Sequence, residues 1–180
     1  MPRHIALLRA VNVTGHNKLA MADLRTMAES LGFEDVQTIL QSGNLVFSCA
    51  GHTTARLEET LQDAARAQLG LDTDFMVRTV REWRAIIDGN PMPEQARDDP
   101  AHLLLLVLKA KPAMTEARSI QNSIPGREKL HLGERHAYIH YADGVGRSKL
   151  TTAWLDKKLG TRGTARNWNT VLKLAALVGA

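Results

Sequence analysis

The sequence contains a single cysteine, Cys49, among its 180 residues, which excludes an intramolecular disulfide. A lone thiol fits a reducing cytoplasm, and we expect Cys49, at the end of an apolar stretch, to be buried and unreactive. No apolar stretch approaches the roughly 20 residues that a membrane-spanning helix needs. The N-terminal residues MPRHIALLRAVNV lack a signal-peptide cleavage pattern, so we predict a cytoplasmic protein with no membrane partner.

The motifs that identify common catalytic and cofactor sites are also missing. No serine stands in a G-x-S-x-G motif, and neither H-E-x-x-H nor G-x-G-x-x-G occurs. The segment Gly144–Lys149 does not have the spacing of a phosphate-binding P-loop. His136 and His140 lie on one predicted strand, about 13 Å apart at the usual rise, which is too far to share a metal. We therefore predict no cofactor and no metal site, and the sequence leaves open whether the protein is an enzyme.

Aromatic residues make up only 4% of the chain. Sheet-based RNA readers stack bases on strand aromatics, and here the predicted hairpin strands offer only Phe47, Tyr138 and Tyr141. No K/R-G-F/Y block is present. The scarcity argues against sequence-specific RNA recognition and leaves binding to a nucleic-acid backbone open.

Positive charge is concentrated near the C-terminus. The net charge is +4, yet the segment from Gly144 to Lys173 alone carries +6, because seven Lys and Arg accompany a single acidic residue, Asp156. Such a local excess favours an anionic partner. For Lys157 and Lys158 a solvated helix face is the better explanation, whereas Arg147, Lys149 and Arg166 lie at the ends of predicted elements.

Apolar periodicity and turn residues predict a regular order of elements in the first half of the chain. Thr79 and Glu82 have the spacing of a capping box at the start of a helix. The expected elements are a strand at His4–Arg9, a helix at Met21–Leu31, strands at Val36–Leu40 and Leu45–Cys49, a helix from Thr53 or Thr54 to Gly70, a strand at Thr73–Val77 and a short helix that ends at Gly89.

The second half repeats this order after the proline-rich segment Asn90–Pro100, which is the best internal boundary. The expected elements are a central strand at His102–Leu108, a helix from Pro112 through Ile120, hairpin strands at Glu128–Leu132 and His136–Tyr141, a helix capped by Ser148 that ends at Gly160, a strand at Gly163–Arg166 and a last helix at Asn169–Val178.

The order β-α-β-β-α-β followed by a helix therefore occurs twice. This is the order of the ferredoxin-like split β-α-β unit, so we predict an α+β protein that arose by tandem duplication. The first repeat covers residues 1–90, a proline-rich connection covers 91–101 and the second repeat covers 102–180. The short connection favours one compact body. The sequence leaves open whether the repeats pack as separate halves or exchange strands.

Four sequence blocks resemble a known bacterial family. They are LLRAVNVTGHNKLAMADLR, TILQSGNLVF, GRSKL and TARNWNTVLKL, and their order and spacing are similar to those of domain of unknown function 1697. The resemblance implies a duplicated ferredoxin-like fold and supplies no reaction. Two positions depart from the family pattern, namely Ala10, where glycine is frequent, and Leu40, where an aromatic residue is common.

Three polar segments of these blocks are candidates for one binding site. Helix N-termini with nearby Arg and Lys favour phosphate or carboxylate groups, so our leading hypothesis is a small anionic or phosphorylated ligand. The alternatives are a nucleic-acid-backbone binder and an interaction module in which these residues only maintain the fold. The oligomeric state is not predicted. The candidate ligand-binding residues are Arg9, Asn12, Lys18, Gln41, Asn44, Arg147, Lys149, Arg166 and Asn167.

Overall fold

The computed structural model describes residues 1–13, 15, 17–112 and 114–180. These residues form two compact units, of which the first contains Met1–Ile87 together with Leu174–Ala180, and the second contains Asp88–Lys173. Each unit has its own four-stranded antiparallel sheet. In the part of the chain that the structure describes, no helix combines the length and apolar character needed to cross a bilayer.

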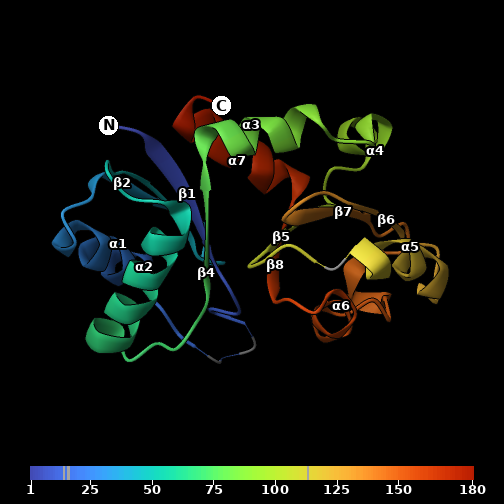
Figure 1. Cartoon of the computed structure of the whole chain (residues 1–180), viewed down its shortest axis with the longest axis horizontal. Helices are drawn as coiled ribbons and strands as arrows, with labels where there is room; N and C mark the ends of the chain where they lie inside the picture. The colour runs from blue at the N-terminus through green and yellow to red at the C-terminus, as the bar shows by residue number, and fades with distance from the viewer. Residues whose placement is uncertain (14, 16, 113) are drawn as a thin grey trace. The chain divides into compact units, whose positions relative to one another are not determined.

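The first unit has the strand order β2-β3-β1-β4. Strands β1, β2 and β4 are labelled in Figure 1. Helices α1 and α2 cover one face of this sheet, where their apolar residues join those of the strands in a single core. The elements are β1 (Arg3–Leu8), α1 (Met21–Ser30), β2 (Glu34–Ile39), β3 (Asn44–Ser48), α2 (Thr54–Leu69), β4 (Phe75–Thr79) and α3 (Val80–Asp88).

Strand β1 is apolar on both of its faces. Ala6 and Leu8 belong to the core beneath α1 and α2, while Ile5 and Leu7 point to the opposite face because side chains alternate along a strand. All four side chains are fully buried. The middle of β1 therefore holds no polar side chain, and the candidate site residues of this unit lie in the loops and turns beyond its end.

The helices of the first unit begin and end at the residues that local chemistry predicts. Thr53 caps α2, and Gly70 ends it in a left-handed conformation with φ of 60°. The predicted capping box is confirmed: Thr79 Oγ1 accepts from the Glu82 N–H at 3.1 Å, and Glu82 Oε2 accepts from the Thr79 N–H at 2.8 Å.

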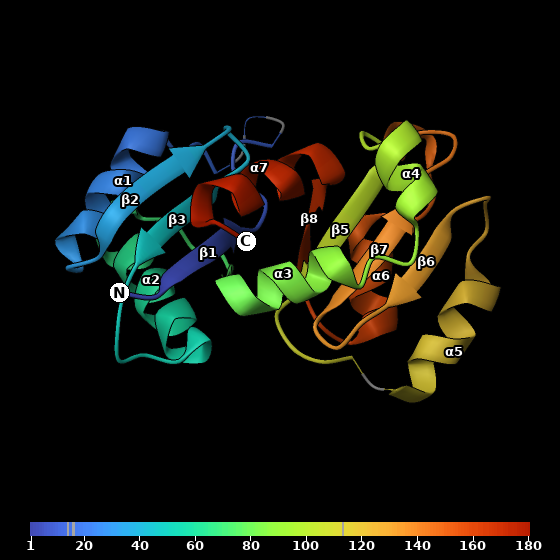
Figure 2. The ribbon, with the colours of Figure 1, turned by 90° about the horizontal axis from the view of Figure 1, so that it is seen from above.

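The second unit has the strand order β6-β7-β5-β8, and β5 lies between β7 and β8 (Figure 2). Helices α5 and α6 lie on one face of this sheet. The elements are α4 (Pro93–Asp98), β5 (Leu103–Leu108), α5 (Met114–Ser123), β6 (Lys129–Leu132), β7 (His136–His140), the 3-10 turn η1 (Val145–Arg147), α6 (Thr152–Leu159), β8 (Gly163–Asn167) and α7 (Trp168–Val178).

One helix of this half was not predicted, and one predicted cap is wrong. The proline-rich segment, which we predicted to connect the two repeats, contains the short helix α4, and Pro93 stands in the first turn of this helix. Ser148 was expected to cap the next helix, but Thr151 does so by accepting from the Trp154 N–H. Two hydroxyl residues stand near this helix start, and capping propensity alone does not choose between them. The expected start of α5 at Pro112 and Ala113 lies partly outside the described residues.

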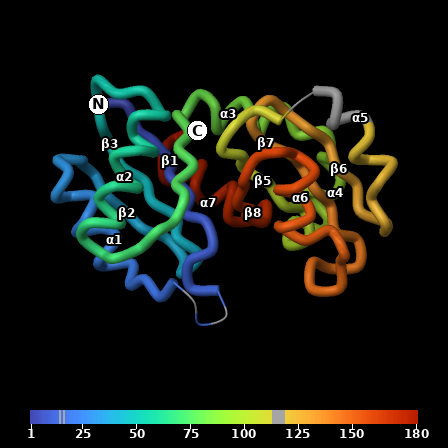
Figure 3. The backbone as a smooth tube through the Cα atoms, turned by 60° about the horizontal axis from the view of Figure 1, so that its bottom comes forward, coloured from blue at the N-terminus to red at the C-terminus, as the bar shows by residue number. Residues whose placement is uncertain are grey.

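The two sheets confirm the duplicated ferredoxin-like fold. Each sheet pairs its strands in the same order, with the last strand of the repeat next to the first (Figure 1). Within the described residues each sheet uses strands of one repeat only, so the repeats do not exchange strands. The course of the backbone through each repeat can be followed in Figure 3.

Left-handed backbone conformations gather at one end of the first sheet. Ala10, Asn12 and Asn17 have φ angles of 51°, 54° and 49° in the loop after β1, and Leu40, in the turn after β2, has φ of 57°. Asn tolerates this region well, whereas Ala and Leu do not. The left-handed backbone at Ala10 gives a physical reason for glycine at this position.

We predict that Ala10→Gly stabilises the protein by about 0.5 to 1 kcal/mol, because glycine removes the steric cost of a positive φ. The measurement is urea denaturation of the variant beside the unchanged protein. The matched control is Ala67→Gly in the exposed last turn of α2, which should destabilise by about 0.5 kcal/mol because glycine is a weaker helix former than alanine. Destabilisation by Ala10→Gly would contradict the strain at this loop.

Candidate functional site

Asn12 connects the two loops of the first unit that were predicted to contribute to a site. Its Nδ2 donates to the carbonyl oxygens of Leu19, at 2.9 Å, and Gln41, at 2.8 Å. Its Oδ1 accepts from the Leu19 N–H at 2.8 Å. The amide of Asn12 therefore holds the loop after β1 against the turn between β2 and β3, which is a structural task.

Asn44 has a similar task at the same end of the first sheet. It is completely buried, and its Nδ2 donates to the Ile39 carbonyl at 2.8 Å and to Ser42 Oγ at 3.0 Å. The turn is tight at Gly43, where an added Cβ would lie 2.6 Å from Val11 Cγ2. Asn44 thus closes a turn that only glycine can complete.

The remaining candidates of the first unit lie at the same loops. Arg9 directly follows β1 and is partly buried. Its backbone N–H donates to the Asp74 carbonyl at 3.0 Å. Lys18 and Gln41 are exposed. Lys18 precedes Leu19, whose backbone is hydrogen-bonded to Asn12, and the Gln41 carbonyl accepts from Asn12 Nδ2. The structure therefore brings these five predicted residues to two connected loops and gives Asn12 and Asn44 structural roles there.

Arg166, in the second unit, lies inside the protein. Only 7% of the residue is exposed, and its Nη1 donates to Thr164 Oγ1 and to the Ala165 carbonyl, both at 2.8 Å. Burial lowers the pKa of its guanidinium to about 10, so the side chain still carries its charge at neutral pH. Burial and local hydrogen bonds favour a structural role for Arg166.

Arg78 in β4 is the counterpart of Arg166 in the first repeat. Its Nη1 also donates to the preceding carbonyl, that of Val77, at 2.8 Å, and it lies 3.7 Å from Glu58 Oε1 in a buried ion pair. Glu58 Oε1 in turn accepts from the Val77 N–H at 2.8 Å. Both repeats therefore place a buried arginine in the last strand, which is a shared feature of the fold.

Asn167 caps the helix that follows β8. Its Oδ1 accepts from the Thr170 N–H at 3.0 Å and from the Thr170 hydroxyl at 3.1 Å. A side-chain oxygen that accepts from the N–H three residues later is the usual N-cap arrangement. The structure thus gives Asn167 the local role that its residue type favours at a helix start.

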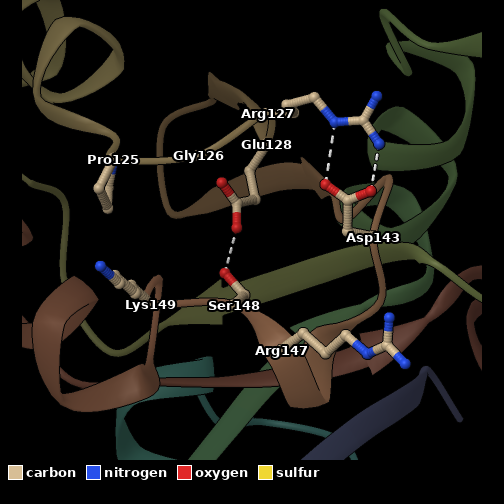
Figure 4. A pocket seen from close by; sticks show the side chains of 8 residues that line it. All are labelled: Pro125, Gly126, Arg127, Glu128, Asp143, Arg147, Ser148 and Lys149. Atoms are coloured by element: carbon tan, nitrogen blue, oxygen red, sulfur yellow. Dashed lines mark hydrogen bonds and ion pairs between the residues drawn. The ribbon is translucent and has the colours of Figure 1, made fainter.

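The predicted residues Arg147 and Lys149 line an open cavity of about 170 Å³ in the second unit (Figure 4). One side of the cavity comes from the loop between α5 and β6, and the other comes from the chain between β7 and α6. The lining residues are Pro125, Gly126, Arg127, Glu128, Asp143, Arg147, Ser148 and Lys149.

One carboxylate of the cavity is held by an arginine. Arg127 donates to Asp143 through both Nε and Nη2, and the Nε–Oδ2 distance is 2.9 Å. This hydrogen bonding lowers the pKa of Asp143, and the positive charges of Arg127 and Arg147 lower it further. Asp143 is therefore ionised at neutral pH and directed at Arg127, as Figure 4 shows.

The second carboxylate is engaged by a hydroxyl. Ser148 Oγ donates to Glu128 Oε1 and accepts from the Leu150 N–H at 2.9 Å. The Tyr141 hydroxyl donates to the Leu150 carbonyl at 3.1 Å, and burial together with the charge of Glu128 raises the pKa of Tyr141 to about 12. The Ser148–Glu128 hydrogen bond connects the two loops of the cavity, and the hydrogen bonds to Leu150 hold the loop that carries Ser148.

The cations at the rim are not engaged in this way. Arg147 and Lys149 are exposed, and within the described residues neither forms an ion pair. Figure 4 shows the Lys149 ammonium on the side of Pro125 and the Arg147 guanidinium below Asp143, with the Glu128–Ser148 pair between them. The cavity thus presents two solvent-facing cations beside acids that already have partners.

Sequence reasoning missed Arg127, Glu128 and Asp143. The residues Pro125 and Gly126 indicate a turn, and nothing in the local pattern pairs that turn with a loop 16 residues later. The signal was the opposite charge of Arg127 and Asp143 at the two ends of a predicted hairpin, where an antiparallel pair brings chain ends together. Among the described residues, no group of three or more His, Cys, Asp and Glu side chains is arranged to hold a metal ion.

Comparisons with known proteins agree with the fold and name no activity. A family model described as "Protein of unknown function (DUF1697)" matches residues 1–138. The conserved bacterial protein SP0830 from Streptococcus pneumoniae has a solved structure similar to this one, with a TM-score of 0.77, 22% identity and 98% of each chain covered. At that identity the similarity shows the fold alone. No curated protein matches the sequence.

We predict that Arg166→Ala lowers the free energy of unfolding by about 2 to 3 kcal/mol, because it removes buried packing and leaves hydrogen-bond acceptors unpaired. The measurement is urea denaturation. The control Arg147→Ala changes an exposed side chain and should stay within about 0.5 kcal/mol of the unchanged protein. An Arg166→Ala protein of normal stability that no longer binds an anionic ligand would instead support the original assignment of Arg166 to the site.

Proposed function

Because the chain belongs to the DUF1697 family, whose description states no activity, we propose its function from geometry: it binds a small anionic ligand at the second unit's cavity. The ligand class is a phosphate or carboxylate compound of the cytoplasm. The residues proposed to bind it are Arg147 and Lys149, with Arg127 at the same cavity.

The observation that carries the proposal is that the carboxylates of the cavity have partners within the protein, whereas two of its cations form no ion pair in the described part of the chain. Arg127 forms an ion pair with Asp143 that offsets its charge. Ser148 donates one hydrogen bond to Glu128 Oε1, and Glu128 Oε2 is buried without a hydrogen-bond partner among the described residues. Arg147 and Lys149 remain exposed at the rim without a carboxylate within ion-pair distance among the described residues. A phosphate or carboxylate group is the natural partner for such cations, and a guanidinium binds it through two parallel hydrogen bonds.

The size of the cavity limits the ligand. A volume of about 170 Å³ is small beside the roughly 300–1,000 Å³ of sites that enclose drug-sized molecules. It suits the anionic group of a metabolite, with the rest of the molecule extending into solvent. The proposal therefore concerns recognition of a charged group rather than enclosure of a large cofactor.

The other predicted residues take a different place in this proposal. Asn12, Asn44 and Asn167 make hydrogen bonds that hold turns or a helix end, and Arg166 is buried. Arg9, Lys18 and Gln41 belong to the first unit, and we do not include them in the cavity. We propose that these seven residues support the fold. Of the ligand-binding residues predicted from the sequence, we propose that Arg147 and Lys149 bind the ligand.

A nucleic-acid backbone is the second candidate partner, and the charge distribution favours it. The second unit carries a net charge of +5 and the first −1. The aromatic residues once considered for base stacking are unsuited to it, because Phe47, Tyr138 and Tyr141 are at most 4% exposed. Such binding would therefore be sequence-independent, governed by phosphate contacts and strongly weakened by salt.

We predict that the double variant Arg147→Ala/Lys149→Ala weakens binding of inorganic pyrophosphate by at least roughly tenfold, since each lost charge-assisted hydrogen bond contributes about 1.5–3 kcal/mol. The measurement is isothermal titration calorimetry of the full chain at low and at moderate salt. Lys157→Ala is the matched control, because it removes an exposed cation of α6 outside the cavity.

Three outcomes separate the candidate functions. Pyrophosphate binding that is lost in the double variant and kept in Lys157→Ala supports the cavity. Equal loss in the control, together with binding of short oligonucleotides that vanishes in salt, supports the nucleic-acid backbone. If the unchanged chain binds neither probe, the anion-binding proposal is wrong and an interaction module remains.

A further inference from the structure

A second cluster of titratable groups lies in the second unit, at the end of the sheet from which the cavity loop departs. Asp99 follows α4, His102 precedes β5 and His140 ends β7. Asp99 Oδ1 lies 2.8 Å from His102 Nδ1, and Asp99 Oδ2 lies 2.9 Å from His140 Nε2. One carboxylate thus accepts from two imidazoles, and we call these three residues the Asp99 clasp.

The protonation of the clasp follows from its geometry. An ionised carboxylate only accepts hydrogen bonds, so His102 carries its proton on Nδ1 and His140 on Nε2. The two hydrogen bonds lower the pKa of Asp99, which is consistent with an ionised carboxylate at neutral pH. Only 13% of the His140 side chain is exposed, so this half of the clasp is well shielded from water.

Backbone hydrogen bonds connect the Asp99 clasp to the loop that carries the cavity residues. The Tyr141 N–H donates to the His102 carbonyl at 2.9 Å, and the Gly144 N–H donates to the Tyr141 carbonyl at 2.9 Å. A Cβ built on Gly144 would lie 3.9 Å from His102 Nε2, so the imidazole lies alongside the loop. The loop that starts here carries Asp143 and Arg147, which line the cavity.

The clasp also has a fixed support. The Pro100 carbonyl accepts from the Trp168 N–H at 3.1 Å, and the His102 N–H donates to the Asp99 carbonyl at 3.1 Å. The segment that presents Asp99 is therefore held by the start of α7 as well as by its own turn. A carboxylate on a held segment that binds the start of β5 and the end of β7 can set the place of the loop that follows β7.

We propose that Asp99 is a positioning residue for the anion site, holding the Tyr141–Arg147 loop through His102 and His140 so that Arg147 faces the cavity. This inference rests on the proposed function. It assigns the clasp a role at the cavity although none of its three residues lines it. A group held only loosely loses much of its contribution to binding, because the ligand must then order it.

The test compares four variants of the full chain. Asp99→Asn removes the charge and replaces one of the two acceptor oxygens by an N–H₂ group that faces an imidazole N–H. Asp98→Asn is the matched control, because it makes the same change one residue away, at an exposed carboxylate that pairs with Arg97. His140→Ala removes one donor, and His140→Gln returns an N–H near the position of Nε2.

Two readouts are measured for each variant after circular dichroism and thermal denaturation have shown that it is folded. The first is the Kd for inorganic pyrophosphate. We expect Asp99→Asn and His140→Ala to weaken binding by about tenfold, and Asp98→Asn and His140→Gln to stay within about threefold. The second is the amide NMR shift of Gly144 and Gly146, which should move in Asp99→Asn and not in Asp98→Asn, with or without pyrophosphate.

The two proposals fail in different ways. If Arg147→Ala/Lys149→Ala loses pyrophosphate while Asp99→Asn and His140→Ala bind normally, the positioning role is overturned and the anion site stands. If the unchanged chain binds no pyrophosphate, the anion site is wrong, and the shifts of Gly144 and Gly146 still show whether the clasp positions the loop. If Asp99→Asn does not fold, the pair His140→Ala and His140→Gln decides by loss and rescue.

Discussion

The arrangement of both units depends on one constraint, the burial of a central strand on both faces. In β1 the residues Ile5 to Leu8 are fully buried, and in β5 Leu103, Leu105 and Val107 are buried as well as Leu106 and Leu108. A strand of this kind has no room for a polar side chain in its middle. Polar and charged residues therefore occur where strands end and loops begin, which is where both the cavity and the Asp99 clasp are found.

Buried arginines are the exception that the fold accommodates. Arg78 and Arg166 lie in the last strands of their repeats and donate to the preceding carbonyl. Arg78 also has Glu58 nearby, and Arg166 has Thr164. A buried guanidinium is tolerated only with hydrogen-bond partners, so the sequence must supply them locally. Two arginines of the second unit thus lie in opposite environments. Arg166 is buried and hydrogen-bonded in a strand, whereas Arg147 faces solvent at a cavity.

In the second unit the partners of the carboxylates determine which positively charged side chains remain exposed. Asp143 and Glu128 are held by Arg127 and Ser148, and Asp99 is held by two histidines. Each carboxylate is an anchor between two segments that are far apart in the sequence. Asp143 and Asp99 have their partners within the protein, so Arg147 and Lys149 are the exposed cations that we propose for an external anion. This distribution is the physical basis of the proposed site and of its support.

The features that depend on neighbouring residues could be predicted from the sequence. The capping box of Thr79 and Glu82 and the helix stops at Gly70 and Gly160 arise from interactions a few residues apart. Where two local signals competed, the prediction failed, as for Ser148 and Thr151 at the start of α6. The helix α4 was missed because proline and charged residues favour a connection as well as a first turn.

The sequence by itself determined the fold class, because the alternation of apolar strands and helices with their glycine stops occurs twice and admits the ferredoxin-like order. It also located the concentration of positive charge. Only the tertiary structure decided which of these charges line a cavity and which are buried, since Arg127 meets Asp143, and Asp99 meets His140, through hairpin and sheet pairing. The reason is physical: local patterns specify elements, whereas the surroundings of a side chain depend on which distant segment the sheet register brings beside it.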